Sequence, residues 1–232
     1  MNRKKAILLT SLLTFIPIIV GLLLWNKLPN EIPVHFNAWG DPDNYESKAF
    51  AVFFLPLFLW VVHLVTGFII LADPKKQNIS DKVFMLTLYI SPAASIFSAV
   101  VMYTGALNIP VSVNMIGNLF VGVIFIIVGN YMPKPHQNYT VGIKIPWALN
   151  DVENWNKTHR MGGFLFMFAG IVCIMGGFIS QEVFENLVEF VVNNCNKISL
   201  VLSNPIFELL FVISSLFKIT FPLEGDSNPD II

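Results

Sequence analysis

The chain has 232 residues, of which 55% are hydrophobic and only 12% charged, and its formal net charge is −1 at pH 7. A soluble domain carries about a quarter charged residues, so the composition excludes an ordinary soluble protein, and the near-zero charge argues against direct nucleic-acid binding. Apolar residues cluster in runs of roughly 20, the length of a helix that crosses a membrane. The sequence predicts an all-α, polytopic membrane helical bundle, a single integral membrane domain over residues 1–232 with about six transmembrane helices.

The apolar runs define the expected spans in chain order. The first run, 6–25, is longer than the core of a signal peptide and lacks a small-residue cleavage site, so we expect it to remain as a helix. The segment 180–197 is amphipathic and is compatible with an interfacial helix or with an extension of the preceding span. The other expected spans cover residues 50–72, 83–105, 109–131, 161–179 and, more weakly, 198–221.

Basic residues predict the side of the membrane on which each connection lies. With the N-terminus inside, the outer connections contain only Lys27, Lys48 and Lys197, and the other basic residues lie inside or near the inner end of a span. The sequence therefore predicts both termini inside (N-in/C-in), a structured outer loop at 26–49 and a long cytoplasmic loop at 132–160.

The first outer loop contains the proline-stiffened stretch LPNEIPVHFNAWGDPDNYESK. Apolar and polar residues alternate from 32 to 37, which suits a short strand, and Gly-Asp-Pro-Asp from residue 40 predicts a turn. No recognised ligand spacing supports a metal site here, so one interpretation is a rigid loop that closes the outer face. The alternative is a recognition surface for a molecule that arrives from outside, formed by His35, Asn37, Gly40, Asp41 and Asp43.

The longest polar interruption is the stretch NYTVGIKIPWALNDVENWNKTHRMGG at 138–163. Asn150 and Glu153 have capping-box spacing, which predicts a helix that begins near Asp151 and continues into the fifth span. On this helix Trp155 and His159 are four residues apart and share a face. Glu153 and His159 lie on nearly opposite faces, so they would not converge for acid–base catalysis.

Two interpretations of this stretch stay open. Its tryptophan and basic side chains are compatible with anchors at the membrane interface, and Arg160 is placed to pair with a lipid phosphate, with Glu153 or with a partner protein. Anchoring alone does not require the other polar and turn-forming residues, so we expect a cytoplasmic docking surface. Its candidate residues are Asn138, Gly142, Lys144, Pro146, Trp147, Glu153, Trp155, Thr158, His159 and Arg160.

Polar residues inside the spans need a partner or a cavity, because they are costly in lipid. Asn118 follows Gly117, and Gly122 is one turn further on, a pattern that predicts close helix packing and an interhelical hydrogen bond. His63 is the lone ionisable residue deep in a span. We expect it to be hydrogen-bonded across helices, and a proton-linked role is the alternative.

Two motifs resemble the SdpI family of bacterial membrane proteins. The pattern LPxxIPxHFNxxGxPD from Leu28, followed by Ser-Lys, is similar to an N-terminal, DUF1648-like module. GNYMPK, NYTVGIKIPWAL and ENWNKTHRMGG are similar to the second module, although Lys144-Ile145 and Ala148 stand where the family usually has Arg-Thr and Thr. The resemblance implies an N-terminal module at 6–72, an SdpI-like module at 109–180 and a divergent region at 181–232.

The resemblance also implies a function. The chain would be an immunity protein of the bacterial plasma membrane that protects the cell against a secreted antimicrobial peptide toxin, sensed by the outer loop. Some members would hold a cytoplasmic repressor at the membrane, here through the 138–163 stretch. We expect the lipid bilayer, the toxin and the repressor as partners, and no direct nucleic-acid contact.

Other functional classes are weaker. No protease, hydrolase, P-loop or dinucleotide signature occurs, so we expect no catalytic residue, no cofactor and no metal. A small-solute transporter lined by His63, Asn114 and Asn118, with helices broken at Pro56 and Pro92, is the main alternative, but it lacks the internal repeat usual in transporters. A structural partner subunit is the third possibility.

Overall fold

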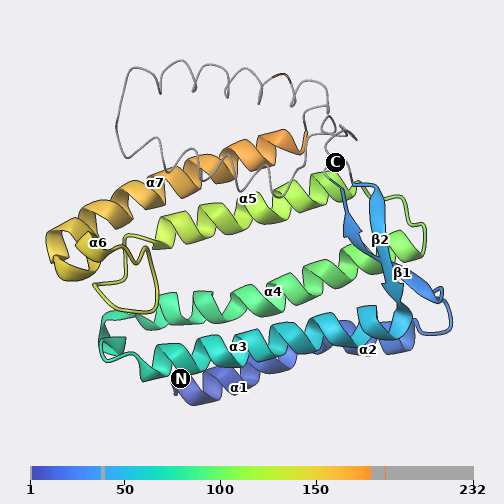
Figure 1. Ribbon diagram of the computed structural model, residues 1–232, viewed down its shortest axis with the longest axis horizontal. Helices are drawn as coiled ribbons and strands as arrows, with labels where there is room; N and C mark the ends of the chain where they lie inside the picture. Colours follow the sequence, from blue (N-terminus) through green and yellow to red (C-terminus); the bar gives the residue numbers. More distant parts are fainter. Residues whose placement is uncertain (1, 38–39, 179–185, 187–232) are drawn as a thin grey trace, which may run out of the picture.

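The computed structural model describes residues 2–37, 40–178 and 186. They form a helical bundle with a β-hairpin at one end (Figure 1). Five helical segments are long and apolar enough to cross a membrane, and they confirm the predicted polytopic bundle: Arg3–Leu23, Phe50–Ala72, Asp81–Ala106, Val113–Tyr131 and Val152–Gly176. The expected span at 198–221, the amphipathic segment at 180–197 and the C-terminus lie outside the described residues. The orientation in the membrane stays a prediction.

The helices of the bundle follow from their capping residues and prolines. Asn2, Ser80 and Ser112 accept hydrogen bonds from backbone N–H groups in the first turns of α1, α4 and α5, which satisfies donors that a helix start leaves free. A π-helical segment, Phe50–Phe54, leads directly into α3. The elements are α1 (Arg3–Leu13), α2 (Ile16–Leu23), α3 (Leu55–Ala72), α4 (Asp81–Ala106), α5 (Val113–Tyr131), α6 (Pro146–Asn150) and α7 (Val152–Gly176).

The first span is broken between α1 and α2. Pro17 lies in the first turn of α2 and has no N–H to continue the helix. Two side chains of α4 donate hydrogen bonds to carbonyl oxygens at this break: Ser95 Oγ to Thr14 at 3.1 Å and the Tyr103 hydroxyl to Pro17 at 3.0 Å. Neighbouring helices thus satisfy backbone groups at the break, as the interior of a membrane requires.

The expected strand is confirmed as part of a hairpin, whereas the turn lies between Asn37 and Asp41, earlier than the expected 40–43, because Pro42 and Asp43 already belong to the second strand. β1 (Glu31–Phe36) pairs with β2 (Pro42–Ser47) in antiparallel fashion, with an irregular register between Pro33 and Phe36. Ile32 of β1 is fully buried in a cluster with Val52 and Met102, whereas every residue of β2 is exposed. The hairpin is therefore seated on the bundle by β1, and β2 lies on its outside.

Helices α5 and α7 touch backbone to backbone. A Cβ added at Gly122 would lie 2.6 Å from the Gly170 carbonyl oxygen, and one at Gly129 would lie 2.6 Å from the Gly163 carbonyl oxygen. The expected close packing at Gly122 is confirmed. The expected interhelical hydrogen bond from Asn118 is wrong, because its side-chain amide donates to the Asn114 carbonyl oxygen, 3.0 Å away in the same helix.

His63 bonds across helices, as expected. Its Nε2 lies 3.1 Å from Thr10 Oγ1 and 3.2 Å from the Ile7 carbonyl oxygen, and the side chain is buried. The contact joins α3 to α1. Asn118 instead bonds to Asn114 within α5. His63 and the two asparagines therefore have separate partners and do not form one lining of a transport path.

Candidate functional site

The two predicted surfaces lie at opposite ends of the bundle. The hairpin with His35 occupies one end, whereas α6, which contains Trp147, and the connection from α5 to α7 occupy the other (Figure 1). The residues 132–151 that join these helices are called the α5–α7 connection below. This two-ended arrangement is the one that the sequence predicted, and the membrane-spanning helices join its two surfaces.

At the hairpin end, the five predicted residues divide into a pair and a turn. His35 Nδ1 lies 2.5 Å from Asp43 Oδ1, and both side chains are exposed. The Asn37 N–H donates to the Asp41 carbonyl oxygen at 2.8 Å, and the Gly40 N–H donates to the Asn37 carbonyl oxygen at 3.0 Å. Within residues 2–37 and 40–178, no group of three or more His, Cys, Asp or Glu side chains is placed to hold a metal ion.

At the other end, Asn138 shapes the α5–α7 connection. Its side chain is fully buried, and its Oδ1 accepts hydrogen bonds from the N–H groups of Thr140 and Val141 at 2.9 and 2.7 Å. Its Nδ2 donates to the carbonyl oxygens of His136 and Val141 at 2.9 and 3.0 Å. The amide thus bonds entirely within the connection, so Asn138 is architectural and does not itself contact a partner.

Trp155 and His159 form a buried pair on α7. Their side chains are 0% and 1% exposed, and the rings stack with 3.8 Å between centroids. The Trp155 indole donates to the Pro135 carbonyl oxygen at 2.9 Å. The interpretation of Trp155 as an interfacial anchor is therefore wrong: the indole faces the protein, because its N–H finds a backbone acceptor there.

The bonds of His159 define its protonation. Its Nε2 lies 2.9 Å from the backbone N–H of Ile143, and its Nδ1 lies 2.8 Å from the Trp155 carbonyl oxygen. A backbone N–H can only donate and a carbonyl oxygen can only accept. The ring is therefore neutral, with its proton on Nδ1, and both nitrogens are used to hold the connection.

Gly142 makes this arrangement possible. Its φ of +123° is a conformation that side chains with a Cβ rarely adopt. A Cβ at this position would also collide with His159 Nε2 and lie 3.2 Å from the Trp155 ring. Glycine is needed here twice, once for the backbone and once for the space that the two rings occupy.

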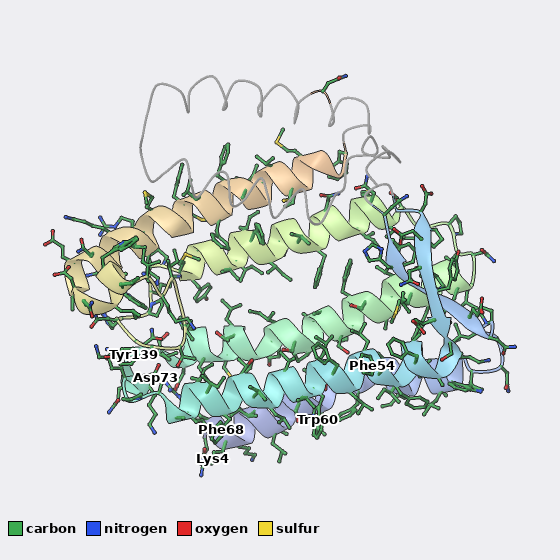
Figure 2. All side chains as sticks on the ribbon, in the orientation of Figure 1. Lys4, Phe54, Trp60, Phe68, Asp73 and Tyr139 are labelled. Atoms are coloured by element: carbon green, nitrogen blue, oxygen red, sulfur yellow. The ribbon has the colours of Figure 1, made fainter. Side chains whose placement is uncertain are left out.

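Asp73, which sequence reasoning missed, holds the connection from the other side. It is buried at the end of α3, next to Tyr139 (Figure 2). Its Oδ2 accepts from the Tyr139 N–H at 3.0 Å and the Thr140 hydroxyl at 2.6 Å, and its Oδ1 accepts from the Lys75 N–H at 2.7 Å. Burial raises the pKa of Asp73, but the hydrogen bonds from Thr140, Lys75 and Tyr139 outweigh it and hold the pKa below the ordinary 3.8.

Gln137 ties the two connections at this end together. Its Oε1 accepts from Lys75 Nζ at 2.7 Å, and its Nε2 donates to the Leu149 carbonyl oxygen at 2.8 Å. Asn78 Nδ2 donates to the Gln137 carbonyl oxygen at 2.6 Å. The segment after α3 therefore supports both the connection and α6. These contacts join residues about 60 positions apart, and no local sequence pattern predicts them.

The predicted docking residues thus divide by exposure. Asn138, Trp155 and His159 are buried and form a frame with Gly142, and Thr158 is half-buried. Trp147 is 61% exposed on α6. Glu153 is bound to Lys157, with 2.7 Å between Oε1 and Nζ. The exposed members of the set are Gly142, Lys144, Pro146, Trp147, Glu153 and Arg160.

The helix start predicted near residue 151 is confirmed, but its cap is one residue later than expected. Asp151 is the N-cap of α7, and its Oδ1 accepts from the Asn154 N–H at 2.6 Å. Asn150 instead ends α6. A short helix that stops immediately before α7 displaced the cap from Asn150, and the capping-box pattern alone could not indicate it.

In comparisons with known proteins, two different family models match the two ends of the bundle. Residues 12–59, which include the hairpin, match the family model described as domain of unknown function DUF1648. Residues 134–220 match the SdpI/YfhL protein family, a match that contains most of the α5–α7 connection and all of α7 and extends into the region we expected to diverge. No curated protein and no solved structure matches the chain. The chain therefore matches the SdpI/YfhL family over residues 134–220 and DUF1648 over residues 12–59, the two modules that its sequence motifs resemble.

Proposed function

We propose that this protein is an immunity protein of the bacterial plasma membrane that protects its cell against a secreted antimicrobial peptide toxin. One observation carries the proposal: a single bundle of membrane-spanning helices bears a folded, exposed surface at each end. The match of residues 134–220 to the SdpI/YfhL family supports the same function. An outer surface suits reception of a toxin, and an inner surface suits a response.

The hairpin is the proposed toxin-sensing surface. All of β2 is exposed, and the His35–Asp43 pair presents an imidazole and a carboxylate on the same hairpin. Gly40, in the turn, lies against Val113 and Asn114 at the start of α5, so a molecule bound to the hairpin sits directly over this helix.

A growth assay tests the immunity function. The gene is expressed in a toxin-sensitive bacterium, the membrane level of the protein is measured, and cells are challenged with a panel of purified peptide toxins. We expect growth at toxin concentrations that kill the empty-vector strain. Replacing the pair (His35→Gln with Asp43→Asn) should reduce this protection, whereas Glu46→Gln, an exposed carboxylate on the same strand, should retain it. Survival no better than the empty vector for every toxin, at confirmed membrane levels, would count against immunity.

At the other end, Lys144 and Trp147 are the proposed docking site for a cytoplasmic repressor. The indole of Trp147 is exposed on a helix that Gln137 holds in place, and an exposed Trp on a rigid support is a typical anchor of protein interfaces. Its neighbour Lys144 adds an exposed positive charge.

Imaging of tagged repressors tests the docking site. Candidate repressors of the host are fused to a fluorescent protein and observed before and after toxin addition. We expect one of them to move to the membrane in the presence of toxin, and we expect Trp147→Ala, but not Trp147→Phe, to prevent this. Equal recruitment by the wild-type protein and Trp147→Ala would show that the indole is not part of the docking site.

A further inference from the structure

Helix α7 carries a stripe of exposed apolar side chains. Phe164, Phe168, Ile171 and Met175 are spaced by three or four residues, and each is at least half exposed. Side chains at this spacing lie on one face of a helix. In a protein that spans a membrane, an exposed apolar stripe of this kind faces the acyl chains of lipids.

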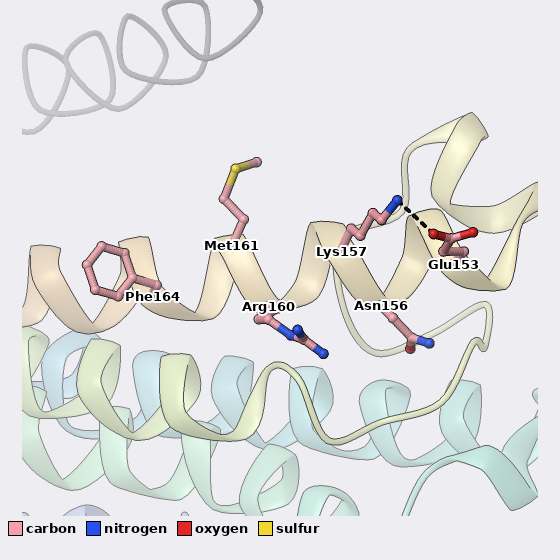
Figure 3. A pocket seen from close by; sticks show the side chains of 6 residues that line it. All are labelled: Glu153, Asn156, Lys157, Arg160, Met161 and Phe164. Atoms are coloured by element: carbon pink, nitrogen blue, oxygen red, sulfur yellow. Dashed lines mark ion pairs between the residues drawn. The ribbon is translucent and has the colours of Figure 1, made fainter.

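Toward the start of α7 the same face becomes polar and forms a shallow open pocket. Six residues line it (Figure 3): Glu153, Asn156, Lys157, Arg160, Met161 and Phe164. Phe164 belongs to both the stripe and the pocket, so the pocket continues the lipid-facing surface. Arg160 precedes Phe164 by about one turn, or about 6 Å along the helix, which is comparable to the depth of about 5–8 Å of one headgroup region.

The charge of the pocket is concentrated on Arg160. Lys157 is neutralised by Glu153, 2.7 Å away. Arg160 is exposed and makes no ion pair or hydrogen bond with any residue in the described part of the chain. Asn156 and Arg160 leave the helix on the same side (Figure 3). A guanidinium fork next to an amide donor is suited to the oxygens of a phosphate group.

We propose that this pocket binds a phospholipid of the leaflet at the N-terminal end of α7. Arg160 and Asn156 donate hydrogen bonds to its phosphate, and Met161 and Phe164 contact the first part of an acyl chain. A protein partner would account for the charge at Arg160, but it would not account for the continuity of the pocket with Phe164 and the apolar stripe. The site is separate from the repressor-docking site at Lys144 and Trp147, and it does not depend on the immunity function.

Native mass spectrometry of the full-length protein, released from detergent micelles, tests this site. The probes are phosphatidylglycerol and, as a free-phosphate arm, inorganic phosphate. We expect the wild-type protein to retain phosphatidylglycerol and not inorganic phosphate. Arg160→Gln should lower lipid retention by about fivefold, the effect of one basic residue near an anionic membrane surface. Arg160→Lys should restore part of the retention.

Lys82→Gln is the matched control, because it removes the same charge from an exposed residue outside the pocket. We expect it to leave lipid retention unchanged. An equal loss in Lys82→Gln, or no loss in Arg160→Gln with its helical content intact by circular dichroism, would overturn the proposal. Equal retention of inorganic phosphate would make this a general anion site. Unchanged lipid retention with lost repressor recruitment in Arg160→Gln would make it a protein surface.

Discussion

The indole ring of Trp155 stacks on the imidazole ring of His159, one turn further along α7, with 3.8 Å between the ring centroids. Both rings bond to the α5–α7 connection, Trp155 through the Pro135 carbonyl oxygen and His159 through the Ile143 N–H. The pair therefore fixes the connection against α7. It also explains how the exposed residues of the connection, Trp147 among them, obtain a rigid support.

Replacing each tryptophan in turn should distinguish the structural role of Trp155 from the proposed docking role of Trp147. Trp155→Ala removes a fully buried indole, which costs about 3–5 kcal/mol of unfolding free energy in protein cores, so we expect a large fall in the thermal midpoint in detergent. Trp147→Ala removes an exposed indole and should leave the midpoint almost unchanged. Thermal melts followed by circular dichroism provide the measurement. Similar midpoints for the two variants would contradict the burial of Trp155.

Gly142→Ala should loosen the connection. The new methyl group meets His159 Nε2 while the backbone keeps a positive φ, and such a conformation costs about 1–3 kcal/mol in a residue other than glycine. Limited proteolysis of the connection should become faster. Gly117→Ala is the control, because nothing lies within 4 Å of the added methyl group and alanine favours helix. Equal cleavage of both variants would show that the space beside His159 is not limiting.

Because Asp73 bonds to the α5–α7 connection through its carboxylate, we expect the connection to lose order in acid. Its pKa in the folded protein lies below the ordinary 3.8, so its ionised form contributes stability above this pH, and the contribution is lost as the pH falls through the folded-state pKa. We expect the amides of Tyr139 and Thr140 to stay protected between neutral pH and about pH 5 and to lose protection below about pH 4.

Hydrogen–deuterium exchange, corrected for the intrinsic exchange rate at each pH, measures this protection. Asp73→Asn should reduce it already at neutral pH and should remove most of its pH dependence in acid. If the variant keeps the acid transition of the wild-type protein, another group is responsible for it.

Gly170→Leu should separate α5 from α7. A Cβ at this position would lie 2.6 Å from the Gly122 carbonyl oxygen and 2.8 Å from the Ile126 side chain, so a larger side chain cannot enter without moving a helix backbone. We expect a lower thermal midpoint and a lower yield of a disulfide engineered between the two helices. Gly117→Leu, in open space on α5, should change neither. A normal cross-linking yield for Gly170→Leu would contradict backbone contact at this crossing.

Local patterns were sufficient for most of the fold. Apolar runs of membrane-spanning length located the five described spans, and the turn residues near Gly40 located the end of β1. The strand β2 was missed because both of its faces are exposed, so it lacks the alternation that marks a half-buried strand.

The site was less predictable because its contacts join distant parts of the chain. A tryptophan at the mouth of a span usually faces the interface, but the Trp155 indole faces inward and donates to the Pro135 carbonyl oxygen, 20 positions away. Asp73 precedes Pro74 as in many ordinary turns. Its bonds to Tyr139 and Thr140 cross more than 60 positions, and a single sequence contains no local signal for them.

The paired glycines on α5 and α7 have a mechanical consequence. A Cβ at Gly122 or Gly129 would lie only 2.6 Å from a carbonyl oxygen of α7, so one helix has little room to shift against the other, and the helices should tilt as one stiff lever. The turn at Gly40 rests on one end of this lever, and α6 lies at the other. If the hairpin receives a peptide, as proposed, this stiff pair of helices would transmit its displacement to α6 and Trp147 as a rigid motion.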